Sequence, residues 1–347
     1  MNNIRSIIVI VMLLLIVKLQ AIAQDIHFSQ AEFSPMTLNP ALTGTDAPIR
    51  AGVKFRNQWP IVGPSYNTTQ GFADIRFGED DTPKQDFLSL GINIYNDLAA
   101  GTNMMTNKGE VHLAYHMGLD ENNRVGAGIY LGGGHRFTNE NGKWESQYDG
   151  TTFNYALESG EQFDNQSFGF VDAGFGLDYR YKSGESSTAE NDQKEFNAGV
   201  AIYHINRPNN AFIANENSRL PIRLSYFING NIGLRQSRNT LMPGLYINHQ
   251  RNAFEIMYGT YYGYIIQEGS KITGFRKPTM IAGGLFHRFN DAVIVKGLLE
   301  IKSFAVGMSY DINLSRLTSA SRTVGGFEVF VMYRSRYSKR VKDDGTL

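Results

Sequence analysis

Long stretches of the chain alternate between apolar and polar residues, the pattern of a β-strand with two different faces. In residues 110–119, Val111 and Leu113 fall on one side, and Glu110 and His112 fall on the other. Successive side chains of a strand point to opposite faces of a sheet. This segment is therefore predicted to face lipid on its apolar side and an enclosed lumen on its polar side.

The first alternating segment, residues 50–59, has a cationic polar face that carries Arg50, Lys54 and Arg56. About fourteen such segments follow one another, an even number that suits an outer-membrane barrel. Each is roughly ten residues long, which fits a tilted transmembrane strand better than the shorter strands of soluble sheets. The predicted fold is all-β: a transmembrane antiparallel β-barrel of about 14 strands over residues 48–337.

Composition supports this fold class and excludes several kinds of chemistry. The 347 residues include 36 Gly, 18 Tyr and 22 Phe but only 10 Pro, a profile that suits many strands and tight turns. Lys plus Arg equals Asp plus Glu at 33 each, so nothing indicates nucleic acid as a partner. The absence of cysteine excludes disulfides and thiolate metal sites.

The first 23 residues have the features of a secretory signal peptide. Arg5 supplies the positive region, residues 7–17 are apolar, and Ala21 and Ala23 fit a small-x-small cleavage site. The alternative is a membrane anchor, but the apolar run is short for a bilayer span. An exported chain of this kind is periplasmic, secreted or an outer-membrane barrel, and the strand pattern predicts the outer membrane after removal of this peptide. At the other end, residues 338–347 are predicted to be a basic tail.

Residues 24–47, here called the lead-in, have no periodicity and contain prolines that discourage both helix and central strand. Four sizeable apolar residues nevertheless occur in it: Phe28, Phe33, Met36 and Leu38. Free leaders are mostly polar. We therefore predict that these side chains pack within the barrel or across its mouth; the alternative is a mobile leader.

The longest connection, residues 138–166, is a candidate binding loop, because long loops are commonly functional. It carries four aromatic residues among polar ones: Trp144, Tyr148, Phe153 and Tyr155. Such an amphipathic mixture suits partner contact, and the alternative is that they fold back or line the membrane interface. Two short turns, at residues 251–252 and 290–291, fall on the same predicted side as this loop. Either a strand is miscounted or these outer turns are unusually short.

No catalytic, cofactor or metal site is predicted. His112 and His116 are four apart, which on a strand separates them by about 13 Å, too far to share a metal ion. Gly126 and Gly128 begin like a dinucleotide loop, but the third glycine is missing. We expect a protein that is not an enzyme.

Several motifs resemble one family. QDIHFSQ at 24–30, LNPALTG at 38–44 and FRNQWP at 55–60 are similar to the start of the PorP/SprF family of type IX secretion outer-membrane proteins. YHINRPNNAF at 203–212, VGMSYDINLSRLTSAS at 306–321 and GGFEVFVMYR at 325–334 agree with it. Ile26 departs from the proline expected there, and the chain runs on beyond the last motif.

The resemblance implies an outer-membrane barrel of a Bacteroidota-type bacterium, with no enzyme activity and no cofactor. It implies a role in the export or surface anchoring of a partner adhesin that carries a C-terminal secretion signal, with gliding motility as one use. Other type IX secretion components and membrane lipid are the further partners implied. The alternative function is a transport barrel that passes a small hydrophobic or polar solute, since the strand number alone does not decide.

Overall fold

Fourteen strands form a closed barrel in the part of the chain that the structure, a computed structural model, describes. The described residues are 25–61, 65–78, 85–99, 101, 103–138, 145–147, 154, 156–158, 160, 166–184, 191–212, 218–267, 279–315 and 318–335. The strands are β1 (Ile49–Gln58), β2 (Tyr66–Phe77), β3 (Phe87–Ala99), β4 (Met104–Gly118), β5 (Asn123–Phe137), β6 (Ser167–Ser183), β7 (Lys194–Tyr203), β8 (Arg223–Gly233), β9 (Asn239–Gln250), β10 (Ala253–Gln267), β11 (Thr279–Arg288), β12 (Ala292–Ile301), β13 (Phe304–Asn313) and β14 (Val324–Arg334).

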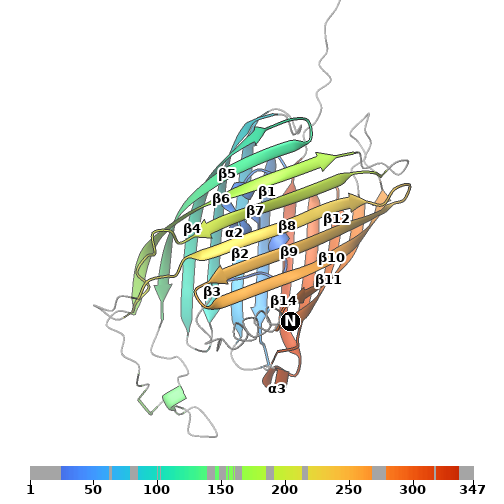
Figure 1. Cartoon of the computed structure of the whole chain (residues 1–347). Helices are drawn as coiled ribbons and strands as arrows, with labels where there is room; N and C mark the ends of the chain where they lie inside the picture. Colours follow the sequence, from blue (N-terminus) through green and yellow to red (C-terminus); the bar gives the residue numbers. More distant parts are fainter. Residues whose placement is uncertain are drawn as a thin grey trace, which may run out of the picture.

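Each strand pairs with the next one along the chain, and β1 pairs antiparallel with β14 to close the ring (Figure 1). The closing seam runs from the pair Arg50 and Arg334 to the pair Gln58 and Gly326. Closure leaves no strand edge along the seam, as a barrel in lipid requires. The predicted antiparallel barrel and its strand number are confirmed.

The two faces of the wall have the chemistry that the alternation predicts. On β4, Val111 and Leu113 are 53% and 42% exposed, whereas Glu110 and His112 are buried in the interior. The cationic face of β1 also points inward, with Arg50, Lys54 and Arg56 among the most buried large side chains. The apolar outer face is suited to lipid. Among the described residues, no helix is long and apolar enough to span a membrane.

The two ends of the barrel differ. At the termini end, β1 begins and β14 ends; at the long-loop end lie the β5–β6 and β7–β8 connections, together with α3 (Thr318–Ser321). In Figure 1, α3 and the short η3 (Glu145–Gln147) of the β5–β6 connection both lie at the lower side. The two-residue turn after β9 and the three-residue turn after β11 are also at the long-loop end. Because the barrel has fourteen strands, as predicted, no strand was miscounted, and these two turns are unusually short.

The wall is uneven in height, because β3 to β6 contain 13, 15, 15 and 17 residues and β7 and β8 contain only 10 and 11. Strands β3 to β6 are therefore longer than the roughly ten residues expected from the sequence. The extra length of β5 and β6 lies toward the long-loop end, where β7 has already stopped.

The lead-in runs through the interior of the barrel from one end to the other. It forms three short helical turns, η1 (Ala31–Phe33), α2 (Pro35–Leu38) and η2 (Pro40–Leu42), and α2 lies within the ring of strands in Figure 1. At the long-loop end, the Asp25 N–H donates to the Gln250 side chain, 2.9 Å away, where β9 ends. At the termini end, Asp46 pairs with Arg50 at the start of β1.

Candidate functional site

The lead-in and the wall around it form the candidate functional site. The four large apolar residues of the lead-in pack inside the barrel. Phe28, Met36 and Leu38 are 4%, 1% and 5% exposed. Phe33 is half-buried, and its ring stacks on Phe330 of β14 with 4.3 Å between centroids. Burying side chains of this size removes apolar surface from water, about 1.5–3 kcal/mol for each one fully buried.

A turn at Asn39 locks the middle of the lead-in to the wall. The Asn39 Nδ2 donates to the backbone oxygens of Leu177 and Val200, at 3.0 and 3.1 Å, and its Oδ1 accepts from the Ala41 N–H at 2.8 Å. Glycine makes the close approach possible, because a Cβ at Gly176 would lie 1.9 Å from the Asn39 Oδ1. The wall is thus shaped to receive this turn.

Buried charges hold the segment before η1. The Glu328 carboxylate of β14 accepts the N–H groups of Ser29 and Gln30, at 2.8 and 3.0 Å. Arg56 lies 3.0 Å and Lys54 lies 3.3 Å from the same carboxylate. Removing one partner of such a buried group costs about 3–5 kcal/mol, because the opposite charge is left without compensation. The cationic face of β1 therefore serves to hold the lead-in.

A second ionic contact fixes the lead-in at the long-loop end. His204, which follows β7, lies between the Asp25 and Asp172 carboxylates, with 2.8 Å between its Nδ1 and Asp172. Burial alone would lower the pKa of His204, but the two carboxylates raise it above its ordinary value. Burial would likewise raise the pKa of Asp25, and His204 and Arg223 lower it. The contact is an ion pair between the start of the lead-in and the wall.

The lead-in also pairs with the wall farther along, through Glu32 near mid-height and through Asp46 at the termini end. The Glu32 carboxylate accepts from the Tyr261 hydroxyl at 2.7 Å and from the Lys296 ammonium at 3.0 Å. Asp46 lies between Arg50 and Arg180. Burial would raise the pKa of Asp46, yet the two guanidinium groups lower it to about 2. Ionic contacts are thus spread along the whole length of the lead-in.

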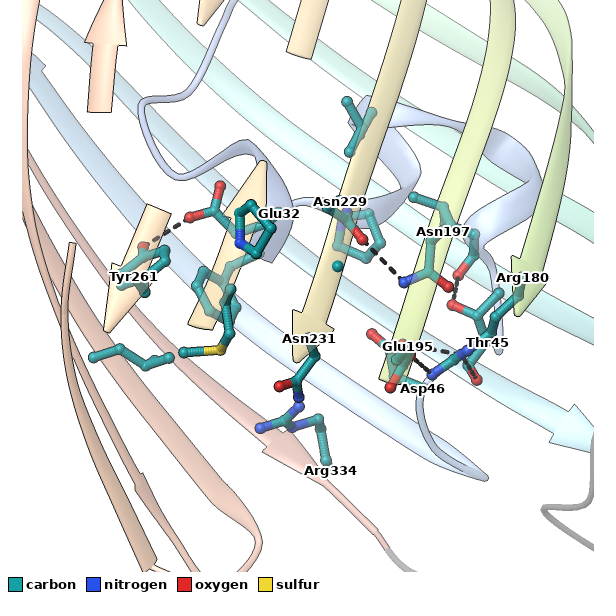
Figure 2. A pocket seen from close by; sticks show the side chains of 18 of the residues that line it. Glu32, Thr45, Asp46, Arg180, Glu195, Asn197, Asn229, Asn231, Tyr261 and Arg334 are labelled. Carbon is teal, nitrogen blue, oxygen red and sulfur yellow. Dashed lines mark hydrogen bonds and ion pairs between the residues drawn. The ribbon is translucent and has the colours of Figure 1, made fainter. Parts of the chain in front are cut away.

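Between the lead-in and the wall of β6 to β12, a cavity of about 720 Å³ opens toward the termini end. Its floor is apolar, with Phe33 and Leu38 of the lead-in facing Met242 and Phe286 of the wall. Figure 2 shows the polar part, where Asn197 and Asn229 are hydrogen bonded and Arg180 contacts Asp46 and Glu195. The mixture of apolar floor and polar rim suits a binding cavity.

The two histidines considered from the sequence have structural roles. His112 lies 3.3 Å from Glu110 and stacks on Tyr130, and His116 contacts the Thr43 oxygen of the lead-in at 3.1 Å. No group of three or more potential metal ligands occurs among the described residues. His116 therefore helps to hold the lead-in, whereas His112 packs within the wall.

The four aromatic residues predicted to bind a partner, Trp144, Tyr148, Phe153 and Tyr155, lie outside the described residues. The signal peptide and the basic tail also lie outside them. The polar anchors Ser29, Asn39 and Glu328 were not predicted. The sequence carries only weak indications of these anchors. Glu328 lies on the polar face of the last strand, and Ser29 and Asn39 interrupt the apolar residues of the lead-in.

Comparison with known proteins finds several solved structures that are similar to this chain. Similar solved structures include the toluene transporter TodX of P. putida (TM-score 0.43, 9% identity, 86% of this chain and 93% of that one) and a FadL homologue of Pseudomonas aeruginosa (0.43, 8%, 86% and 93%). CdiB from Acinetobacter baumannii has a TM-score of 0.42 at 10% identity, over 82% of this chain and 60% of that one. No curated protein sequence matches the chain.

A closed barrel with an apolar outer face and a polar, filled interior defines the class: a β-barrel of the outer membrane. Residues 20–333 match the family described as type IX secretion system membrane protein PorP/SprF. The chain belongs to this family, as its motifs at both ends predicted.

Proposed function

We propose that this barrel supports the export or surface anchoring of one partner adhesin, which carries a C-terminal type IX secretion signal, with gliding motility as a possible outcome. The observation that carries the proposal is the occupied interior: the lead-in passes from end to end and is held by ion pairs at Asp25, Glu32 and Asp46. A barrel filled in this way has no wide pore to offer a partner, so the partner contacts its rims and loops.

The proposed orientation follows from the connections. Outer-membrane barrels place long loops outside and chain termini in the periplasm, so the long-loop end faces out after removal of residues 1–23. The cavity then opens to the periplasm, where other type IX components could reach it. The adhesin contact is assigned to the long-loop end, with Trp144, Tyr148, Phe153 and Tyr155 as the contact residues proposed on sequence grounds.

A second candidate, passage of a small solute, is favoured by the cavity of about 720 Å³, which is within the size range of small-molecule sites. Its apolar floor and polar rim would accept an amphipathic solute. Transport would require the lead-in to move, because it lies between this cavity and the long-loop end. The two candidates therefore differ in whether the lead-in must leave its place during function.

Deletion of the gene tests the leading proposal. Surface proteins of intact cells are labelled with a membrane-impermeant biotin reagent and compared with those of the parent. We expect one adhesin to disappear from the surface while other type IX substrates remain. An unchanged surface profile, together with lost uptake of a solute, would refute the proposal and favour transport. Alanine at the four loop aromatic residues should weaken display with the barrel still assembled; normal display would place the contact elsewhere.

A further inference from the structure

Within the described part of the chain, the outer half of β6 has a free edge. β5 and β6 pair along their whole length, from Asn123 with Tyr181 to Phe137 with Ser167. The pairing of β6 with β7 starts only at Phe175 with Ile202. Residues 167–174 of β6 therefore have a partner strand on one side only. The chain leaves β7 at Tyr203, at the level where this edge begins.

The direction of the backbone groups along this edge can be worked out from the ladder. Thr138 donates to the Gln166 oxygen at 2.9 Å, so even-numbered residues of β6 bond to β5. Odd-numbered residues point the other way, toward the free side. At Ala173 this is observed directly, since its oxygen accepts from the Ile205 N–H at 3.0 Å. Gly169 and Val171 present their backbone groups to the same side.

One side chain already imitates a neighbouring strand at the lower part of this edge. The Asn206 Oδ1 accepts from the Ala173 N–H at 3.3 Å, and its Nδ2 donates to the Val171 oxygen at 2.6 Å. An amide that accepts and donates in this way reproduces the bonds of a peptide group on an adjacent strand. Above it, no hydrogen-bond partner within the described chain is found for the edge-facing N–H and C=O of Gly169 or the N–H of Val171.

The free part of the edge lies outside the hydrocarbon layer. Gly169 pairs with His135, His135 pairs with Asn107, and Asn107 pairs with Asn96. The outward side chains of His135, Asn107 and Asn96 form a polar row. Asn96 donates to Asn107 across it at 2.7 Å. The next row toward the termini end, through Ile94 and Val171, is apolar. Unpaired backbone groups are not tolerated in lipid. The polar row places those of Gly169 above the apolar band and the Val171 N–H at its boundary.

The surface beside the edge is also smooth. Gly109, Gly133 and Gly169 line a depression on the outer face, and a Cβ at Gly133 or Gly169 would find its nearest neighbour at 3.8 or 3.7 Å. The outer face next to the edge is therefore free of side chains at these three positions, and Phe212 of the β7–β8 connection packs against the ring of the neighbouring Phe168. Backbone N–H and C=O groups at strand spacing are complementary to one class of ligand, another extended backbone.

We propose that the free edge of β6, at residues 167–171, binds an extended segment of the exported partner polypeptide by strand addition. This inference rests on the proposed function and names the place where the partner binds. Because the contacts are made by backbone groups, the edge selects an extended conformation more than a particular sequence. Asn206 and Ile205 keep the lower part of the edge closed, so the added strand would start at Val171 and run past Gly169 toward the rim.

Gly169→Pro tests the edge with little effect on the barrel. Proline removes an N–H that faces away from β5, so the β5–β6 ladder is kept, and proline is tolerated on edges of this kind. Gly169→Ala keeps the N–H and is the matched control. Display of the adhesin that is lost in the deletion strain should fall at least about tenfold in Gly169→Pro, as expected for loss of one or two hydrogen bonds, and should stay normal in Gly169→Ala.

A photo-crosslinking residue at Ser167 makes the test independent of the proline variant, with the same residue at Leu285, exposed on the opposite wall, as control. We expect Ser167, and not Leu285, to cross-link to that same adhesin. A cross-link to a second copy of this chain, or none to the adhesin, would overturn the inference. If deletion abolishes display while Gly169→Pro displays normally, the edge inference fails alone; if deletion has no effect, the proposed function fails.

Discussion

Substitution of Asn39 should release the lead-in from the wall. Asn39→Ala removes two hydrogen bonds to wall carbonyls and one to the Ala41 N–H, which is left buried without a partner. At about 1 kcal/mol for each bond, the seated state loses about 2–4 kcal/mol, or about 30- to 1,000-fold in its equilibrium with an unseated state. The turn holds the centre of the lead-in, so both halves should loosen.

Limited proteolysis of the purified barrel in detergent measures this effect. The lead-in contains no Lys or Arg, so chymotrypsin, which can cut after Phe33, is the suitable protease. Where opening is fast relative to cleavage, the rate follows the population of the open form. The cleavage rate of Asn39→Ala should therefore rise by the same factor, and Asn252→Ala, in the exposed turn after β9, should leave it unchanged.

Gly176→Ala offers an independent route to the same result, because its Cβ would lie 1.9 Å from the Asn39 Oδ1 and push the turn out. Folding of the barrel is followed separately by heat-modifiable migration on gels. If both variants keep a folded barrel and the parental cleavage rate, the Asn39 turn does not hold the lead-in, and the reasoning from its hydrogen bonds is refuted.

Three further predictions follow from the burial of charge and the two faces of the wall. Glu328→Gln should destabilise the barrel by about 3–5 kcal/mol, seen as a lower midpoint in urea, because two buried cations lose their partner; an unchanged midpoint would contradict this. Leu113→Arg on the outer face should cost about 2–4 kcal/mol in lipid vesicles, whereas Asn122→Arg in an exposed turn should cost nothing measurable. The pKa of His204 is raised in the folded state, so its ion pair with Asp25 should be fully formed below about pH 6.5 and weaken as the pH rises through the raised value. Protease protection of the lead-in should fall accordingly, and His204→Gln should remove that pH dependence.

The alternation of β4 was sufficient to predict its register, because a one-residue slip would expose every polar side chain to lipid. The apolar residues of the lead-in were recognisable for a similar reason, since Phe28 and Met36 have no place in a free leader. The contacts that seat the lead-in could not be predicted: Ser29 and Glu328 are 299 residues apart, and only the closed ring brings them together. The expected strand length of roughly ten residues was too short for β5 and β6, because their extra residues continue the same alternation beyond the apolar band.

The path of the lead-in has a consequence for the order of assembly. Its residues touch β1 and β2 but also β13 and β14, the last strands to be made. A segment that occupies the axis of a ring is most easily placed while the ring is still open, before Arg50 meets Arg334. The lead-in, which is made before the strands, would then act as a template on which the strands are laid, and its polar groups would align β14 for closure. Barrel insertion and lead-in binding are in that case a single step, limited by contacts of very high sequence separation.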